Sequence, residues 1–172
     1  MPDAAWVARL CREGASFIQL RIKEASPQDV RAEIAEALQT CAAEGATLVV
    51  NDYWREAIEL EADFIHLGQE DLAGADVAEI RAAGIRIGIS THDQAELRCA
   101  LATVPDYIAL GPIYPTKLKA MPWAPQGLDR IGEWRAQIPC PLVAIGGITL
   151  ETAPSVLAAG AASAAVVTDI VM

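Results

Sequence analysis

The sequence is poor in histidine and in basic residues. Its 172 residues include 2 histidines, and 13 lysines and arginines stand against 23 aspartates and glutamates, giving a net charge of −10. We therefore expect neither a nucleic-acid partner nor an anionic membrane surface, because both attract basic proteins. No apolar run reaches the roughly 18 residues of a membrane-spanning helix, so no such helix is predicted.

The four cysteines Cys11, Cys41, Cys99 and Cys140 are scattered, with no CxxC pair and no histidine at zinc-ligand spacing. This pattern predicts neither a disulfide framework nor a structural zinc site. The N-terminus also lacks the basic stretch and apolar run of a secretion signal. We therefore expect reduced thiols and a cytoplasmic protein.

The chain does contain a regular alternation of helix-forming and strand-forming segments. Helices are predicted over 3–13, 26–43, 54–60, 77–83, 94–102, 128–137 and 150–159, and strands over 16–20, 47–50, 64–67, 86–89, 107–110, 142–145 and 163–167. Strict alternation indicates a parallel sheet with right-handed crossovers. At 172 residues the chain fits one domain, covering 1–172.

Short polar motifs follow nearly every predicted strand. They are Gln19-Leu20-Arg21-Ile22-Lys23, Asn51-Asp52, His66-Leu67-Gly68-Gln69-Glu70-Asp71, Ser90-Thr91-His92, the segment 111–119 and Gly146-Gly147. An open doubly wound sheet usually has one dominant glycine-rich loop, whereas barrels build their sites from many strand ends. The motifs thus favour a (β/α)8 TIM-type barrel and mark its active-site end.

The two ends of the chain depart from a complete barrel, because it begins with a predicted helix and stops after a predicted strand. The first strand and the last helix of the barrel would then be absent. We expect strands 16–20 and 163–167 to present unpaired edges, through which the chain could self-associate.

Several of these residues have chemistry suited to an anionic ligand. Arg21 and Lys23 alternate along a strand end and so point to one side, where an anion would relieve their repulsion. Asp52 and Asp71 are each expected in a loop, where they close successive βα loops and could converge on one Mg²⁺, although each could instead cap a helix. Gly146-Gly147 could cradle a phosphate or simply form a turn.

Three other residues are open to more than one interpretation. Ser90 either contacts a ligand or caps the following helix. His66 and His92 are each either structural or functional, and no Ser/His/Asp or Cys/His triad is evident.

Taken in order, the motifs resemble the thiamine-phosphate synthase family over roughly residues 6–170. The resemblance implies a (β/α)8 barrel that joins aminopyrimidine methyl diphosphate to thiazole phosphate and releases pyrophosphate with Mg²⁺. It implies that Asp52 and Asp71 hold the metal and that Arg21, Lys23 and Lys119 draw off pyrophosphate. The implied pyrimidine diphosphate contacts are Gln19, Arg21, Lys23, Asn51, Ser90 and Lys119. The implied thiazole phosphate contacts are Thr116, Gly147, Val167 and Thr168.

The loop around residue 118 departs from the family pattern. The family usually has Thr-x-Thr-Lys where this chain has Thr116-Lys117-Leu118-Lys119, so one hydroxyl is replaced by an apolar side chain. Two alternatives to a synthase remain: a thiazole tautomerase of the same family, and a catalytically impaired phosphate-binding or regulatory relative. The intact Gln69-Glu70-Asp71 motif argues against the tautomerase.

Overall fold

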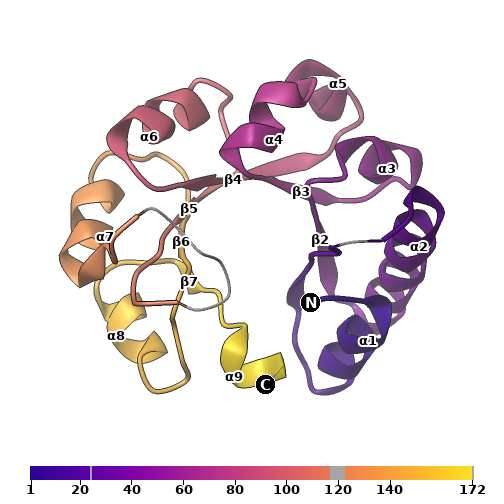
Figure 1. Ribbon diagram of the computed structural model, residues 1–172, viewed down its shortest axis with the longest axis horizontal. Coiled ribbons are helices and arrows are strands. Elements are labelled where there is room, and N and C mark those ends of the chain that lie inside the picture. Colours follow the sequence, from indigo (N-terminus) through magenta and orange to yellow (C-terminus); the bar gives the residue numbers. More distant parts are fainter. Residues whose placement is uncertain (24, 117–122, 172) are drawn as a thin grey trace. The chain divides into compact units, whose positions relative to one another are not determined.

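The computed structural model describes residues 1–23, 25–116 and 123–171, and it divides into two compact units, Met1–Ile87 and Gly88–Met172. Each unit repeats the same pattern, in which a parallel strand is followed by one or more helices (Figure 1). Seven strands lie in the described residues, which confirms the predicted α/β class. None of the helices described is long and apolar enough to cross a membrane.

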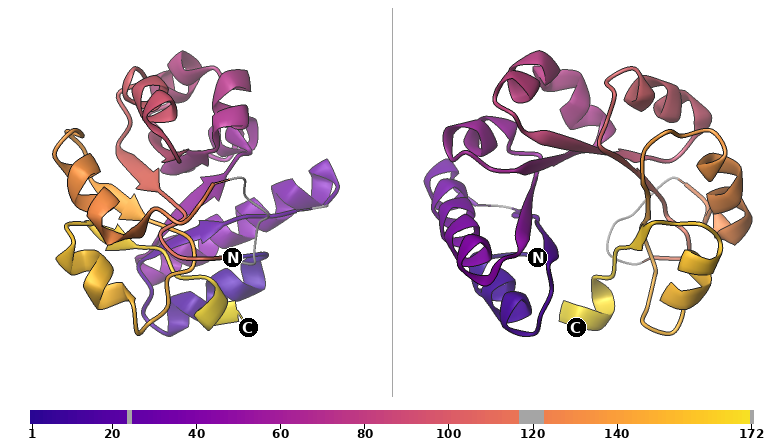
Figure 2. Two further views of the ribbon diagram at one scale, coloured as in Figure 1. Left: turned by 60° about the vertical axis from the view of Figure 1, so that its left-hand side comes forward. Right: turned by 180° about the vertical axis from the view of Figure 1, so that it is seen from behind.

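The first unit contains the strands β1, β2 and β3, which pair in parallel in that order. Its elements are α1 (Ala4–Arg12), β1 (Phe17–Leu20), α2 (Pro27–Glu44), β2 (Thr47–Asn51), α3 (Trp54–Glu59), β3 (Phe64–Leu67), α4 (Gln69–Gly74) and α5 (Val77–Ala82). Helices α1 and α2 pack side by side along the outer side of β1 and β2 (Figure 2). All of β3 and all of β2 except its first residue are buried, as expected for apolar parallel strands.

The second unit repeats this arrangement with β4 to β7, each strand pairing in parallel with the next. Its elements are β4 (Arg86–Thr91, beginning at the end of the first unit), α6 (Gln94–Leu101), β5 (Tyr107–Leu110), α7 (Gly127–Arg135), β6 (Leu142–Ala144), α8 (Ala153–Ala158), β7 (Ser163–Ala164) and α9 (Thr168–Val171). Helices α6, α7 and α8 lie along its outer side (Figures 1 and 2).

The long helix α2 shows how local sequence sets an element. The Ser26 hydroxyl accepts a hydrogen bond from the Asp29 N–H at 3.2 Å, and Pro27 fills the first position, where no N–H is needed. The helix ends at Gly45, which has a left-handed φ of 68° that a side chain would disfavour. The predicted helix, 26–43, is therefore found with each end one residue further along the chain.

The sequence did not predict α4 and α9, and it placed the last strand too far along the chain. Helix α4 has no buried residue, so it leaves no apolar periodicity to detect. Strand β7 ends at Ala164 and not at residue 167, and α9 begins at Thr168. The expectation that Asp71 lies in a loop is therefore wrong, since it lies in the first turn of α4.

The edge of β1 is partly paired, contrary to the expectation of an open edge at residues 16–20. The Met1 amino group donates to the Gln19 carbonyl, and the Arg21 N–H donates to the Met1 carbonyl at 2.7 Å. This is the hydrogen-bond pattern of a parallel bridge. Phe17, at the other end of the strand, is 52% exposed.

Candidate functional site

The ends of β1, β2 and β3 bring two predicted site residues of the first unit, Gln19 and Asn51, together with His66. Gln19 is aligned with Val49 on β2, and its amide Nε2 donates to the Asn51 side-chain oxygen at 3.3 Å. Asn51 is buried and stands opposite His66 on β3. The strand register thus places a polar row at one end of the unit, as predicted from the polar motifs.

The central feature of this row is a contact between two carboxylates. Burial and the negative charge and hydrogen bond of Asp71 raise the pKa of Asp52 to about 6, while Arg21 and the Gly68 main chain oppose this rise. Asp52 has a left-handed φ of 69°, and its N–H donates to the His66 carbonyl at 2.9 Å. Non-glycine residues seldom adopt this conformation, although aspartate does so more readily than most, and Glu61 and Val104 share it outside the proposed site.

Neither carboxylate caps a helix, so the alternative helix-cap interpretation is wrong for both. Helix α3 is preceded by Tyr53 and α4 by Gly68, and neither helix start has a side-chain hydrogen bond. A Cβ built on Gly68 would lie 3.1 Å from the Asp71 Oδ2, so Gly68 leaves space for that carboxylate. Two carboxylates in contact repel each other unless a proton or a cation lies between them.

The charge of Arg21 reaches this pair and the buried His66. Arg21 lowers the pKa of Asp52 against the larger effects that raise it, and burial together with Arg21 lowers the pKa of His66 to about 4. His66 is therefore neutral near pH 7. Arg21 and Lys23 are exposed just after β1, and Ile22 between them is buried. That both basic side chains face one anion stays a prediction.

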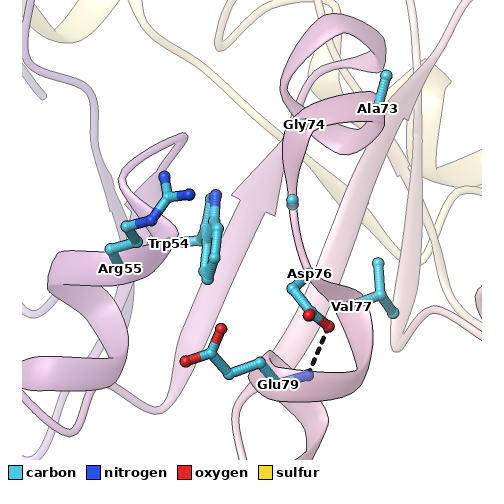
Figure 3. Close-up of a pocket in the computed structure, with 8 residues that line it drawn as sticks. Trp54, Arg55, Ala73, Gly74, Asp76, Val77 and Glu79 are labelled. Atoms are coloured by element: carbon cyan, nitrogen blue, oxygen red, sulfur yellow. Dashed lines mark hydrogen bonds between the residues drawn. The ribbon is translucent and has the colours of Figure 1, made fainter.

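A pocket of about 380 Å³ opens beside the carboxylate pair. Its lining is Asp52, Tyr53, Trp54, Arg55, Glu56, Glu70, Asp71 and Gly74. A second pocket shares Trp54, Arg55 and Gly74 with it and is lined by residues of α5, and Figure 3 shows the Trp54 ring there between the Arg55 guanidinium and the carboxylates of Asp76 and Glu79. The Arg55 guanidinium carbon lies 4.2 Å from the Trp54 ring centre.

Arg55 is a cation of this pocket that the sequence did not single out. The sequence feature that could have indicated a role for Arg55 in the site is its position four residues after the strand end at Asn51. A surface position in a helix does not by itself distinguish a ligand-facing arginine from a solvated one.

In the second unit, Ser90 lies on β4 and aligns with Ala109 on β5. It does not cap α6, because the Asp93 carboxylate accepts the hydrogen bonds of the Ala95 and Glu96 N–H groups at 2.8 and 2.9 Å. The capping interpretation of Ser90 is therefore wrong. Its role toward a ligand stays a prediction.

The glycine pair of the second unit lies in close contact with the loop that follows β5. A Cβ on Gly147 would lie 2.5 Å from the Pro115 carbonyl oxygen and 2.7 Å from that of Tyr114. Both glycines have left-handed φ values, 86° at Gly146 and 69° at Gly147. Packing thus accounts for both glycines, and phosphate binding by Gly147 stays a prediction.

The other predicted phosphate contacts lie on the same unit. Thr116 is half-buried at the end of the described β5–α7 loop, and Val167 is 40% exposed just before α9. Thr168 is the first residue of α9. Lys119 and Leu118 lie outside the described residues.

The donor set of the first unit suits a hard divalent cation. Over residues 1–23, 25–116 and 123–171, no cluster of three or more His, Cys, Asp or Glu side chains is placed to hold a metal. Mg²⁺ does not require one, because it is commonly bound by one or two carboxylates plus water and substrate phosphates. Asp52 and Asp71 are two carboxylates of this kind, and their binding of Mg²⁺ stays a prediction.

Comparison with known proteins agrees with the motifs. The family model described as thiamine monophosphate synthase matches residues 2–170. The chain is 58% identical to a thiamine-phosphate synthase of Rhizobium etli over 98% of this chain and 83% of that protein. It is 49% identical to one of Neisseria meningitidis serogroup B over 97% of this chain and 82% of that protein.

A solved structure, thiamine phosphate pyrophosphorylase from Pyrococcus furiosus, superposes with a TM-score of 0.82 at 27% identity, covering 98% of this chain and 84% of that one. FabK from Thermotoga maritima, at 16% identity and a TM-score of 0.77 over 99% of this chain and 55% of that one, shares the fold alone. The family match spans the described strands of both units. The chain therefore belongs to the thiamine monophosphate synthase family.

Proposed function

We infer that this chain is a transferase that condenses 4-amino-2-methyl-5-pyrimidinylmethyl diphosphate with thiazole phosphate to give thiamine phosphate and pyrophosphate. Family membership supports the reaction, since relatives at 58% and 49% identity are thiamine-phosphate synthases. The observation that carries the chemistry is the contact between the Asp52 and Asp71 carboxylates. A tautomerase would have no need for a metal and diphosphate site of this kind.

We propose that Asp52 and Asp71 bind Mg²⁺. Their mutual repulsion supports this assignment, because a cation between them removes the cost of holding two buried negative charges together. When bound, the ion would supply positive charge to the departing diphosphate.

Basic side chains supply the remaining positive charge in the proposal. Arg21 and Lys23, which are exposed just after β1, bind the diphosphate together with Lys119. They stabilise the charge that develops on the leaving oxygen, which is the largest electrostatic change in the reaction.

The polar side chains orient the pyrimidine diphosphate. Gln19 and Asn51 already bond to each other at 3.3 Å, so their remaining donors and acceptors are held in fixed directions. Ser90 is proposed as a further contact. On the second unit, Thr116, Gly147, Val167 and Thr168 are proposed to bind the thiazole phosphate.

The proposed reaction is a dissociative substitution. The bond between the pyrimidine methylene carbon and the diphosphate oxygen breaks, and its electron pair leaves with pyrophosphate. The electron-rich aminopyrimidine stabilises the cation, and the lone pair of the thiazole nitrogen forms the new C–N bond. No proton transfer by the protein is needed, which is consistent with a His66 that is neutral and buried.

The decisive experiment measures thiamine phosphate formation from both substrates with and without Mg²⁺. We expect product only when both substrates and the metal are present. No product under any of these conditions would favour the catalytically impaired relative, and product without a divalent metal would remove Asp52 and Asp71 from the proposed role.

We further propose that the chain works as one (β/α)8 barrel-type domain in the cytoplasm. The family model extends across both compact units, which supports a single functional domain. Free thiols support a reducing compartment: all four cysteines are unbonded, and the sulfurs of Cys11 and Cys41 lie 3.9 Å apart. Self-association through strand edges is also proposed, and light scattering of the purified chain would test it.

A further inference from the structure

His92 is not used by the proposed chemistry, yet its position is fixed more tightly than that of a surface histidine. It directly follows β4, and both its main-chain N–H and its ring Nδ1 contact the Glu96 Oε2, at 2.7 and 2.8 Å. Its side chain is only 13% exposed. Glu96 itself lies in the first turn of α6, which Asp93 caps.

The same histidine contacts the distant end of the β5–α7 loop in two ways. Its ring stacks on the Trp123 ring with centres 5.6 Å apart and planes 9° from parallel. Its carbonyl accepts a hydrogen bond from the Gln126 Nε2 at 2.8 Å. A ring contact and a main-chain contact thus attach this loop end to the tip of β4.

The base of that loop is closed by its own main chain. The Gln126 N–H donates to the Pro112 carbonyl at 2.7 Å, and the Gly127 N–H donates to the Ile113 carbonyl at 3.1 Å. On its other side, the Tyr114 N–H donates to the Gly146 carbonyl at 3.0 Å. The described parts of this loop, residues 111–116 and 123–126, are therefore held between the β4 tip and the glycine pair, and His92 makes the contacts on the β4 side.

We propose that His92 is a positioning residue for the condensation, acting through Trp123 and Gln126 to fix the β5–α7 loop to the tip of β4. This inference rests on the proposed function, in which Ser90 on β4 contacts one substrate and Thr116 on the loop contacts the other. A bimolecular condensation depends on the alignment of its two reactants, and a displacement of about 1 Å can cost up to ~100-fold in rate. Loosening these contacts disturbs alignment without removing any group that touches substrate.

The test compares the variants Trp123→Ala, Trp123→Phe and His92→Ala with the parent chain. We expect Trp123→Ala to lower kcat about tenfold, within the range that misalignment produces, with a smaller change in KM for either substrate. Trp123→Phe keeps an aromatic face for His92 and should recover most of kcat. The double variant His92→Ala/Trp123→Ala should be no slower than the slower of the two single variants, because each substitution removes the same ring contact between His92 and Trp123.

Trp6→Ala is the matched control. Trp6 lies on α1, where its ring packs against Arg9 at 4.8 Å, and it is part of no proposed site. Its loss should leave kcat unchanged. Thermal melts of every variant separate misalignment from unfolding, and Trp123→Ala keeps the test valid if His92→Ala fails to fold.

The outcomes distinguish the inference from the function on which it rests. An active parent with an unchanged kcat in Trp123→Ala overturns the positioning role alone. A kcat loss that Trp123→Phe does not recover also overturns it, since the stacking would not be the cause. An inactive parent overturns the proposed function, and the positioning role falls with it.

Discussion

The candidate sites of the two units consist of different groups: ionisable side chains in the first unit and closely packed main chain in the second. In the first unit the site consists of side chains with altered ionisation, with the pKa of Asp52 raised to about 6 and that of His66 lowered to about 4. In the second unit the proposed phosphate segment is main chain in close contact, with Gly146 and Gly147 against the β5–α7 loop. Substitutions at the carboxylate pair should therefore reduce activity first, and substitutions at the glycine pair should reduce stability first.

The largest expected effect is on activity, from Asp71→Asn in the first unit. Loss of one metal carboxylate should lower metal-dependent turnover by about 100-fold or more, since metal stabilisation of a leaving group is worth several kcal/mol. Stability should not fall, because the change removes a negative charge that repels Asp52. The measurements are rate against Mg²⁺ concentration and the thermal midpoint without metal. An unchanged Mg²⁺ dependence would remove Asp71 from the site.

The opposite result is expected from Gly147→Ala in the second unit. The added Cβ would lie 2.5 Å from the Pro115 oxygen at a φ of 69°, so strain and overpacking together should cost ~3 kcal/mol of unfolding free energy. Gly84→Ala is the control: it also has a left-handed φ, 79°, but nothing lies within 4 Å of its Cβ position. It should cost only ~1 kcal/mol. Denaturant melts measure the unfolding free energy of both variants. Equal losses in Gly147→Ala and Gly84→Ala would contradict the close-packing argument.

Sequence reasoning succeeded where a residue's role depends on its own strand or helix. The end of β2 at Asn51 and the start of α2 after Ser26 follow from apolar runs and capping residues. It failed for α4, where the short helix has no buried residue, and so misplaced Asp71 in a loop. Helix-cap alternatives for Asp52 and Ser90 could not be resolved either, because capping depends on φ and on hydrogen bonds that the sequence does not encode locally.

The ring contact between His92 and Trp123 could not be predicted from the sequence at all. The two residues are 31 positions apart by their numbers, and no periodicity relates them. Contacts between separate loops depend on how several strands are staggered, which a single sequence leaves open.

A smaller effect is expected from Leu118→Thr, which would restore the hydroxyl usual in the family. If that hydroxyl meets the thiazole phosphate, binding should tighten by ~1 kcal/mol, the worth of one ordinary hydrogen bond. Titration of thiazole phosphate measures this, with Leu118→Val as a control of similar branching but no hydroxyl. Unchanged or weaker binding in Leu118→Thr would mean that the family pattern does not hold at residue 118.

The smallest expected effect is a pH dependence of stability that belongs to the first unit. The pKa of Asp52 is about 6 in the folded chain, against an ordinary value of 3.8. The folded chain therefore binds more protons than the unfolded chain between about pH 4 and pH 6, and the contribution of Asp52 to stability falls as pH rises through that window. Asp52 is partly exposed, so solvent screening keeps the effect small.

The measurement is the thermal midpoint across this pH window in the presence of a chelator. In the parent chain, Asp52 should lower the midpoint as pH rises. In Asp71→Asn the decline should be smaller, because the neighbouring charge is gone. Added Mg²⁺ should reduce the decline in the parent, because a bound cation compensates the deprotonated pair. Identical pH profiles for the parent and Asp71→Asn would show that the two carboxylates do not interact.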